Sequence, residues 1–136
     1  SSAASDVYKR QIIRTAESFS INTIFYTKGT ADIFSPKVVR STMGSIYFVN
    51  FLRLDYLTKL KSDGYRIYAS CLENSISAKG SFTDEKIALI LGNESVGVSQ
   101  DLIMHSDKKI KIDMTGNAQS LNVATAGAIL IYEMCK

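Results

Sequence analysis

Two loops in this chain have the composition of ligand-binding loops. The first covers residues 91–99, LGNESVGVS, and the second runs from Ile112 to Val123, IDMTGNAQSLNV. Glycines such as Gly92 and Gly116 let backbone groups approach a ligand closely, and the start of a helix offers free N–H groups. Each loop follows a predicted strand, and ligands of open α/β sheets bind outside the carboxyl ends of strands. The two loops together therefore predict a small-molecule site.

Either loop alone would be a weak indication, because any α/β protein has glycine-bearing turns between strands and helices. Neither loop contains Gly-x-Gly-x-x-Gly, and the chain contains no Gly-Lys-Ser or Gly-Lys-Thr sequence. The two familiar phosphate-binding loops are therefore absent from the sequence. Ordinary binding of dinucleotides or nucleoside triphosphates is disfavoured.

Taken in order, the loops resemble the SpoU (TrmH-like) RNA methyltransferases. GNESVG at residues 92–97 and IDMTGNAQSLNVATAGAI at residues 112–129 look like the second and third signature motifs of that family. IIRTAESF at residues 12–19 resembles the end of the first motif, and RSTMGSIYFV at residues 40–49 resembles the segment that leads into a strand. The resemblance extends over most of residues 12–136, and an ordered match across separate loops is much more specific than one motif.

The resemblance implies a fold and an activity. The fold would be the α/β SPOUT fold, a mostly parallel sheet flanked by helices with a deep C-terminal trefoil knot. S-adenosylmethionine would bind in the knot of a homodimer, and no metal would be required. The enzyme would transfer a methyl group to a ribose 2′-OH of rRNA or tRNA.

The resemblance also implies which residues form the site. Backbone groups of the two loops would hold the adenine and ribose of the cofactor, with apolar packing from Met114. The expected cofactor-binding residues are Leu91, Gly92, Asn93, Ile112, Met114, Gly116, Ser120 and Leu121. The expected catalytic residues are Arg14, Glu94 and Asn122.

Arg14 matches the arginine of the first motif. Its guanidinium is planar and permanently charged, so it can bind phosphate with two hydrogen bonds but cannot readily act as a general base. We expect Arg14 to fix the phosphate of the target nucleotide and to stabilise the developing alkoxide. Each catalytic candidate also has a purely structural interpretation. Arg14 could be an ordinary surface arginine, and Glu94 a solvated carboxylate in a turn. Ser120 or Asn122 could cap the last helix.

Two features depart from the family pattern. The residues before Ile12 read SSAASDVYKRQ, with Tyr8 where the family has asparagine. We interpret residues 1–11 as a leader outside the family and residues 12–136 as the catalytic domain without its first strand, a loss that would expose sheet edges. Asp113 stands where proline is common in the third motif, and we expect this exchange to loosen the second loop.

The elements that must position these loops follow from hydrophobic periodicity. Short β-branched runs alternate with helical segments, which predicts an α/β domain with a mostly parallel sheet. The predicted strands are Ile21–Thr27, Ser45–Val49, Tyr65–Ser70, Lys86–Leu91 and Lys108–Ile112. The predicted helices are Gln11–Phe19, Pro36 to near Gly44, Leu52–Asp63, a short helix that ends at Met104, and a last helix from Leu121 to the end. Gly64 is the predicted stop of the third helix, and Ser99 is the predicted cap of the fourth.

The last helix is apolar around nearly its whole circumference, which predicts burial on more than one side. In a domain this small, the second buried side would face another subunit. We therefore expect a homodimer that associates through the C-terminal helix.

Composition agrees with one ordinary globular domain. The chain has 136 residues, of which 46% are hydrophobic and 21% charged, and its net charge of +3 permits contact with RNA phosphates without demonstrating it. Its most apolar stretch, Leu121–Cys135, is too short to span a bilayer, so no membrane is expected as a partner. The sequence shows no secretory signal, and Cys71 and Cys135 match no metal-ligand spacing. We expect reduced thiols in a cytoplasmic protein.

Two other interpretations fit parts of the sequence. One is a catalytically inactive RNA-binding or dimerisation remnant of the same fold, in which Arg14 would not face the cofactor loops. The other is a flavodoxin-like or response-regulator-like module, which the alternation of elements alone allows. That module predicts an acidic cluster or a phosphate-binding loop at the end of the first strand, and the sequence has neither there.

Overall fold

The computed structural model describes residues 11–12, 14–16, 18–19, 24–27, 38–40, 47–49, 54–92, 100–117 and 121–136. Its elements follow one another as β1 (Ile24–Thr27), β2 (Val38–Arg40), β3 (Tyr47–Val49), α2 (Leu54–Ser62), β4 (Arg66–Ser70), β5 (Ile76–Ser77), β6 (Ile87–Gly92), α3 (Gln100–Met104), β7 (Lys108–Lys111) and α4 (Val123–Cys135). Residues 11–12, 14–16 and 18 are also helical and form the N-terminal helical segment.

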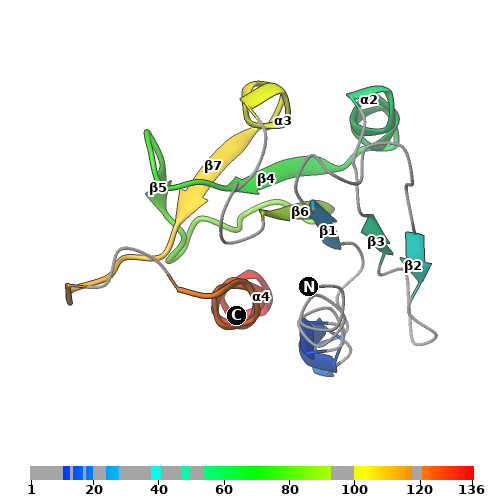
Figure 1. The fold of residues 1–136 in the computed structure, drawn as a ribbon. Helices are drawn as coiled ribbons and strands as arrows, with labels where there is room; N and C mark the ends of the chain where they lie inside the picture. Colours follow the sequence, from blue (N-terminus) through cyan, green and yellow to red (C-terminus); the bar gives the residue numbers. More distant parts are fainter. Residues whose placement is uncertain are drawn as a thin grey trace.

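The centre of the molecule is a five-stranded sheet with the order β1-β6-β4-β7-β5, and every pair of neighbours in it is parallel (Figure 1). Strands β2 and β3 form a separate antiparallel pair. The prediction of an α/β domain with a mostly parallel sheet is confirmed. The trefoil knot remains a prediction, because it depends on the path of segments outside the described residues.

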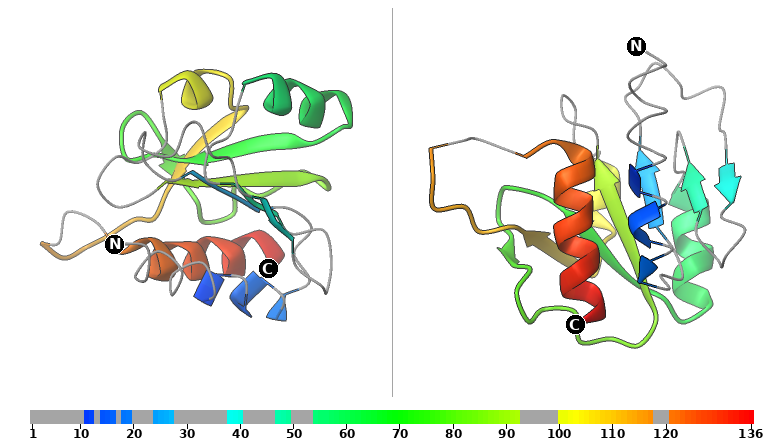
Figure 2. Two further views of the ribbon diagram at one scale, coloured as in Figure 1. Left: turned by 45° about the vertical axis from the view of Figure 1, so that its right-hand side comes forward. Right: turned by 90° about the horizontal axis from the view of Figure 1, so that it is seen from below.

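Helices cover both faces of the sheet, which gives three layers (Figure 2). Helices α2 and α3 lie on one face, and α4 and the N-terminal helical segment lie on the other. Because successive side chains of a strand point to opposite faces, each central strand must be apolar on both sides. Strand β6 meets this requirement with a continuous buried run from Ile87 to Leu91.

The side chains of β6 divide between two cores. Leu89 and Leu91 belong to the core beneath α4, which also holds Ile110 of β7 and Leu130 of α4. Ile90 belongs to the core beneath α2 and α3. Burial on both faces fixes the register of β6 between β1 and β4, since a slip by one residue would exchange the two sets of side chains.

Helix α2 ends at Ser62, and the stop that the sequence predicts at Gly64 follows two residues later. This residue has a φ of +92°, a left-handed conformation that glycine adopts without steric cost. The N–H of Gly64 donates to the Lys61 carbonyl and that of Tyr65 to the Leu60 carbonyl, each at 3.0 Å. These two hydrogen bonds form a Schellman motif, which turns the chain directly into β4.

One predicted helix is wrong. Val38–Arg40, inside the expected helix from Pro36 to near Gly44, is strand β2 and pairs antiparallel with β3. Consecutive β-branched valines favour an extended backbone, and the partner strand Tyr47–Val49 satisfies its hydrogen bonds. Ser35 and Pro36, which suggested the helix start, lie outside the described residues.

The remaining predicted elements are found where the structure describes them. The five predicted strands correspond to β1, β3, β4, β6 and β7, and the last helix begins at Val123 instead of Leu121. The proposed cap Ser99 lies outside the described residues. Strand β5 was not predicted, because two residues give no periodic signal. Within the described ranges, no helix combines the length and apolar character that crossing a membrane requires.

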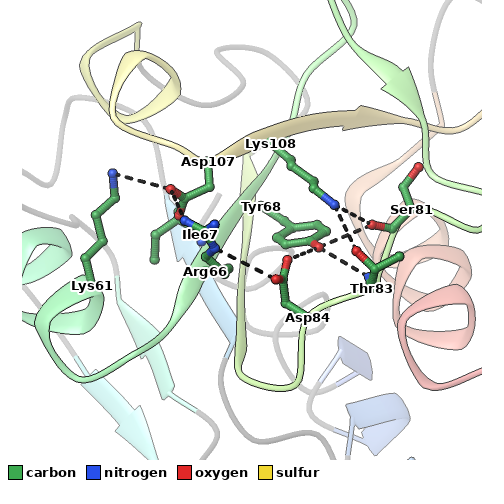
Figure 3. A network of polar contacts seen from close by, with 9 residues as sticks. All are labelled: Lys61, Arg66, Ile67, Tyr68, Ser81, Thr83, Asp84, Asp107 and Lys108. Atoms are coloured by element: carbon green, nitrogen blue, oxygen red, sulfur yellow. Dashed lines mark hydrogen bonds and ion pairs between the residues drawn. The ribbon is translucent and has the colours of Figure 1, made fainter.

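At the amino ends of the strands, Asp107 joins three elements. One of its carboxylate oxygens accepts a hydrogen bond from the Ile67 N–H at 2.7 Å, and the Asp107 N–H donates to the Ile67 carbonyl at 2.8 Å. The other carboxylate oxygen lies 3.4 Å from Arg66 Nη1 and 3.9 Å from Lys61 Nζ (Figure 3). Asp107 therefore connects β7 to β4 and α2.

Tyr68 of β4 is fully buried, and its hydroxyl is a polar group that needs a hydrogen-bond partner. Its hydroxyl donates to Asp84 Oδ2 at 2.5 Å, and its ring stacks on Phe82 with centroids 5.0 Å apart. Lys108 Nζ lies 5.1 Å from the centre of the Tyr68 ring and donates to the Ser81 carbonyl at 3.2 Å (Figure 3). These contacts pair the buried polar groups and hold the segment before β6 against the sheet.

Candidate functional site

The two candidate loops start at the same edge of the sheet. Strands β6 and β7 are parallel members of one sheet, so their carboxyl ends, Gly92 and Lys111, point the same way. Strand β4 lies between them and ends at Ser70. The structure therefore brings the start of each loop to either side of the end of β4, at the edge where ligands of parallel sheets bind.

Leu91, at the start of the first loop, has a structural side chain. It is 1% exposed and belongs to the core beneath α4. A Cβ added to Gly127 of α4 would lie 3.1 Å from Leu91 Cδ1 and 3.5 Å from Ile12 Cγ1. Because Leu91 points into this contact, a ligand at the edge could use only its backbone. The next residue, Gly92, is half-buried.

The second loop changes from packed to open along its length. Ile112 packs against the core beneath α4, and Met114 is half-buried. Gly116 is exposed, and a Cβ added there would meet no atom within 4 Å. Packing within the described residues therefore does not require glycine at position 116, and the backbone there is open to a ligand.

Asn122 caps α4. Its φ of −65° and ψ of 159° are extended, and its side-chain oxygen accepts a hydrogen bond from the Thr125 N–H at 2.8 Å. This is the ordinary structural role expected for an asparagine at the start of a helix. Leu121, immediately before it, is half-buried. The cap occupies the Asn122 oxygen and leaves its amide NH₂ available as a donor.

Arg14 lies on the exposed side of the N-terminal helical segment. Ile12 and Ala16 of that segment are buried in the core beneath α4, and Arg14 is about 200° around a helix from Ile12. No hydrogen bond or ion pair joins the Arg14 side chain to the described residues of either loop. That Arg14 faces the cofactor loops stays a prediction, because residues 93–99 and 118–120 of these loops lie outside the described residues. The predicted site residues Asn93, Glu94 and Ser120 lie outside the described residues.

Sequence reasoning missed the segment that lies between the two loops. After β4 ends at Ser70, the chain turns through Asn74, whose φ is +53°, and the Ser75 hydroxyl donates to the Cys71 carbonyl at 2.5 Å. This turn starts at the same sheet edge as the loops. The signal was present, because the strand Tyr65–Ser70 was predicted and every parallel strand delivers its carboxyl end to that edge.

Known proteins resemble the chain in sequence. The profile of the SpoU rRNA Methylase family matches residues 11–132. The chain belongs to this family. This match confirms the SpoU resemblance of the loops. It does not support the flavodoxin-like or response-regulator-like alternative.

Relatives of this SpoU chain are RNA methyltransferases by name. It is 36% identical over 126 residues to the 23S rRNA (guanosine(2553)-2'-O)-methyltransferase RlmP of Bacillus subtilis (strain 168), an alignment that covers 90% of this chain and 51% of that protein. It is 35% identical over 127 residues to an uncharacterized tRNA/rRNA methyltransferase of Borreliella burgdorferi (strain ATCC 35210 / DSM 4680 / CIP 102532 / B31), with 90% and 56% covered. The SpoU chain spans about half the length of these relatives.

Solved structures share the SpoU fold seen here. The A. aeolicus TrmH/SpoU tRNA modifying enzyme matches with a TM-score of 0.73 and 28% identity, covering 93% of this chain and 66% of that one. An AdoMet-bound rRNA methyltransferase from Sinorhizobium meliloti matches with a TM-score of 0.70 and 30% identity, covering 91% and 49%.

Proposed function

We propose that this chain is the cofactor-binding core of an RNA ribose 2′-O-methyltransferase that uses S-adenosylmethionine. The observation that supports this most directly is the placement of the two family motifs. Their loops start on either side of the end of β4, at one edge of a parallel sheet. The methylated substrate would be rRNA or tRNA, the two classes named for the relatives.

The residues at this edge suit S-adenosylmethionine. Ile112, Met114 and Leu121 offer half-buried apolar surface, and Gly116 offers open backbone, a combination typical of small-molecule sites. In this proposal Asn93 and Ser120 complete the pocket, and the trefoil knot holds the loops together. When bound, the cofactor would supply an electrophilic methyl group, and the two loops would hold it close to the ribose oxygen.

The RNA side of the site is assigned to Arg14, with Glu94 and Asn122. An exposed guanidinium can bind a backbone phosphate with two hydrogen bonds and stabilise negative charge that develops on the 2′-oxygen. Asn122 keeps its amide donor while its oxygen caps α4, so it can contribute to both structure and binding. The proposed catalytic domain is residues 12–136.

The proposed active form is a homodimer that associates through α4. The outer side of α4 presents Ile129 and Tyr132, which are 37% and 52% exposed, and Phe19 is 39% exposed beside them. The rings of Phe19 and Tyr132 meet edge to face with centroids 5.9 Å apart. This apolar surface is typical of a contact between identical subunits.

The proposed location is the cytoplasm, where RNA substrates are found. Cys71 and Cys135 are both free thiols, as is usual in a reducing compartment. Burial raises the pKa of the Cys135 thiol above its ordinary value, so this thiol stays protonated near neutral pH.

Calorimetric titration with S-adenosylhomocysteine tests the cofactor site. We expect saturable binding by the wild-type chain and weaker binding by Asn122→Ala, which removes both the helix cap and the amide donor. Asn122→Ser restores a cap without the amide. If Asn122→Ser binds like the wild type, the cap alone matters; if it binds like Asn122→Ala, the amide contacts the cofactor or the residues that hold it.

A folded wild-type chain that does not bind S-adenosylhomocysteine would contradict the proposal. Transfer of a radioactive methyl group from S-adenosylmethionine to unmodified rRNA or tRNA then tests the activity. Cofactor binding without transfer to either RNA would instead support the catalytically inactive remnant.

A further inference from the structure

The start of the second loop is anchored on both faces of the sheet. Ile112 packs against the core beneath α4, as does Ala78, which follows β5. Asp113 lies toward the opposite face, because its partner Ser77 belongs to β5 and alternates with the buried Ala78 that follows it. There its carboxylate Oδ2 accepts a hydrogen bond from the hydroxyl of Ser77, the last residue of β5.

Ser77 is itself held in place. The Ala78 N–H donates to the Lys111 carbonyl at 2.8 Å, which continues the ladder between β5 and β7 to the point where the loop begins. The Ser81 hydroxyl donates to the Ser77 carbonyl, and the Lys79 N–H donates to Ser77 Oγ at 3.3 Å. The Ser77 hydroxyl thus comes from a fixed backbone and is directed at the loop.

Residues 114–117, the described part of the loop directly after Asp113, have no comparable anchor. Thr115, Gly116 and Asn117 are exposed, and no hydrogen bond is found for residues 114–117. Asp113 is therefore the last residue that is hydrogen-bonded to another strand before the loop opens.

We propose that Ser77 and Asp113 are positioning residues for the cofactor, which fix the start of the second loop through the edge strand β5. This inference rests on the proposed cofactor site. The proline common at position 113 in the family would restrain the backbone by limiting φ. Here a hydrogen bond to a carboxylate supplies the restraint, which opposes the loosening expected from the loss of proline.

The restraint acts on affinity through preorganisation. A loop that is already ordered loses less conformational freedom when a ligand binds, so removing the anchor weakens binding without removing a ligand contact. Because Asp113 is exposed, solvent screening reduces this bond to the range of an ordinary hydrogen bond, about a 3- to 10-fold change in an equilibrium constant. Ser77→Ala and Asp113→Ala should each raise the Kd for S-adenosylhomocysteine by roughly that factor.

The experiment is a double-mutant cycle on the full chain, with calorimetric Kd values for S-adenosylhomocysteine. Both substitutions break the contact between Ser77 and Asp113, and Ser77→Ala also removes the acceptor of the Lys79 N–H. The double variant should therefore be no weaker than Ser77→Ala alone. Asp113→Asn keeps an acceptor oxygen and should restore binding to within about 2-fold. Ser62→Ala is the matched control, since its hydroxyl donates to the Thr58 carbonyl within α2, which leads into the amino end of β4, away from the loops.

Amide hydrogen exchange of the ligand-free chain supplies a readout that does not depend on the cofactor. Ser77→Ala and Asp113→Ala should speed exchange at residues 112–117 and leave β4 and β6 unchanged. Wild-type affinity and exchange in both single variants would overturn the inference, as would fully additive effects. Failure of the wild-type chain to bind S-adenosylhomocysteine would instead overturn the proposed function, and the exchange data would still decide whether Ser77 and Asp113 order the loop.

Discussion

Arg14 and Asn122 differ in how much of the fold depends on them. The Asn122 oxygen caps α4, whereas the Arg14 side chain is exposed and makes no hydrogen bond or ion pair within the described part of the chain. Substitution at an exposed position without such contacts changes stability by only about ±0.5 kcal/mol. Arg14 is therefore the position where catalysis can be tested with little disturbance of the fold.

Arg14→Ala should reduce methyl transfer to RNA by about 100-fold, because a donor that stabilises the reacting oxygen is lost. The Kd for S-adenosylhomocysteine and the melting temperature should stay at wild-type values. Single-turnover assays with labelled S-adenosylmethionine measure the rate. Arg14→Lys keeps the charge but loses the planar pair of donors, so it should restore only part of the rate. Full activity in Arg14→Ala would remove this residue from the site.

At the scale of elements, the contact between α4 and β6 depends on Gly127. An added Cβ would lie 3.1 Å from Leu91 Cδ1, and Leu91 is enclosed in the core. Gly127→Val should therefore lower the free energy of unfolding by about 1–3 kcal/mol and weaken cofactor binding by displacing the start of the first loop. Thr125→Val, on the exposed part of the same helix, is the matched control. Equal urea denaturation curves for the two variants would contradict this packing.

For Asp107 we expect an effect on stability without an effect on cofactor binding, since it lies at the edge of the sheet away from the loops. Asp107→Ala leaves the Ile67 N–H without its partner and should lower the free energy of unfolding by about 1–3 kcal/mol, with no change in cofactor affinity. Asp107→Asn keeps an acceptor and loses only partly exposed ion pairs, so it should cost about 0–1 kcal/mol. If Asp107→Asn is as unstable as Asp107→Ala in urea, charge and not the backbone bond sustains this edge.

Features of the fold that depend on neighbouring residues could be predicted from the sequence, whereas features that depend on distant residues could not. The buried run of β6 and the stop at Gly64 depend on adjacent residues and were predicted. Strand β2 was mistaken for a helix because its pairing with β3 is not visible in its own sequence. The hydrogen bond between Ser77 and Asp113 joins residues 36 positions apart. The sequence alone therefore shows that Asp113 is unusual at its position but not that Ser77 is its partner.

At the scale of the whole molecule, the exposed apolar surface of α4 predicts association. The wild-type chain should sediment as a dimer, and Ile129→Glu should shift it to a monomer because a charge would be buried in the contact. Met104→Glu is the control, since Met104 is 75% exposed on α3, across the sheet from α4. A wild-type chain that sediments as a monomer at micromolar concentration, or a dimer that tolerates Ile129→Glu, would contradict this interface.

The order of strands in the sheet also bears on synthesis. Each described ladder of the five-stranded sheet includes β6 or β7, so the earlier strands β1, β4 and β5 do not pair with one another. On the ribosome, β1 must wait for β6 to be translated, an interval on the order of ten seconds at ordinary elongation rates. During that interval the nascent chain exposes apolar strands, and the core beneath α4 stays open until β7 and α4 have also been made.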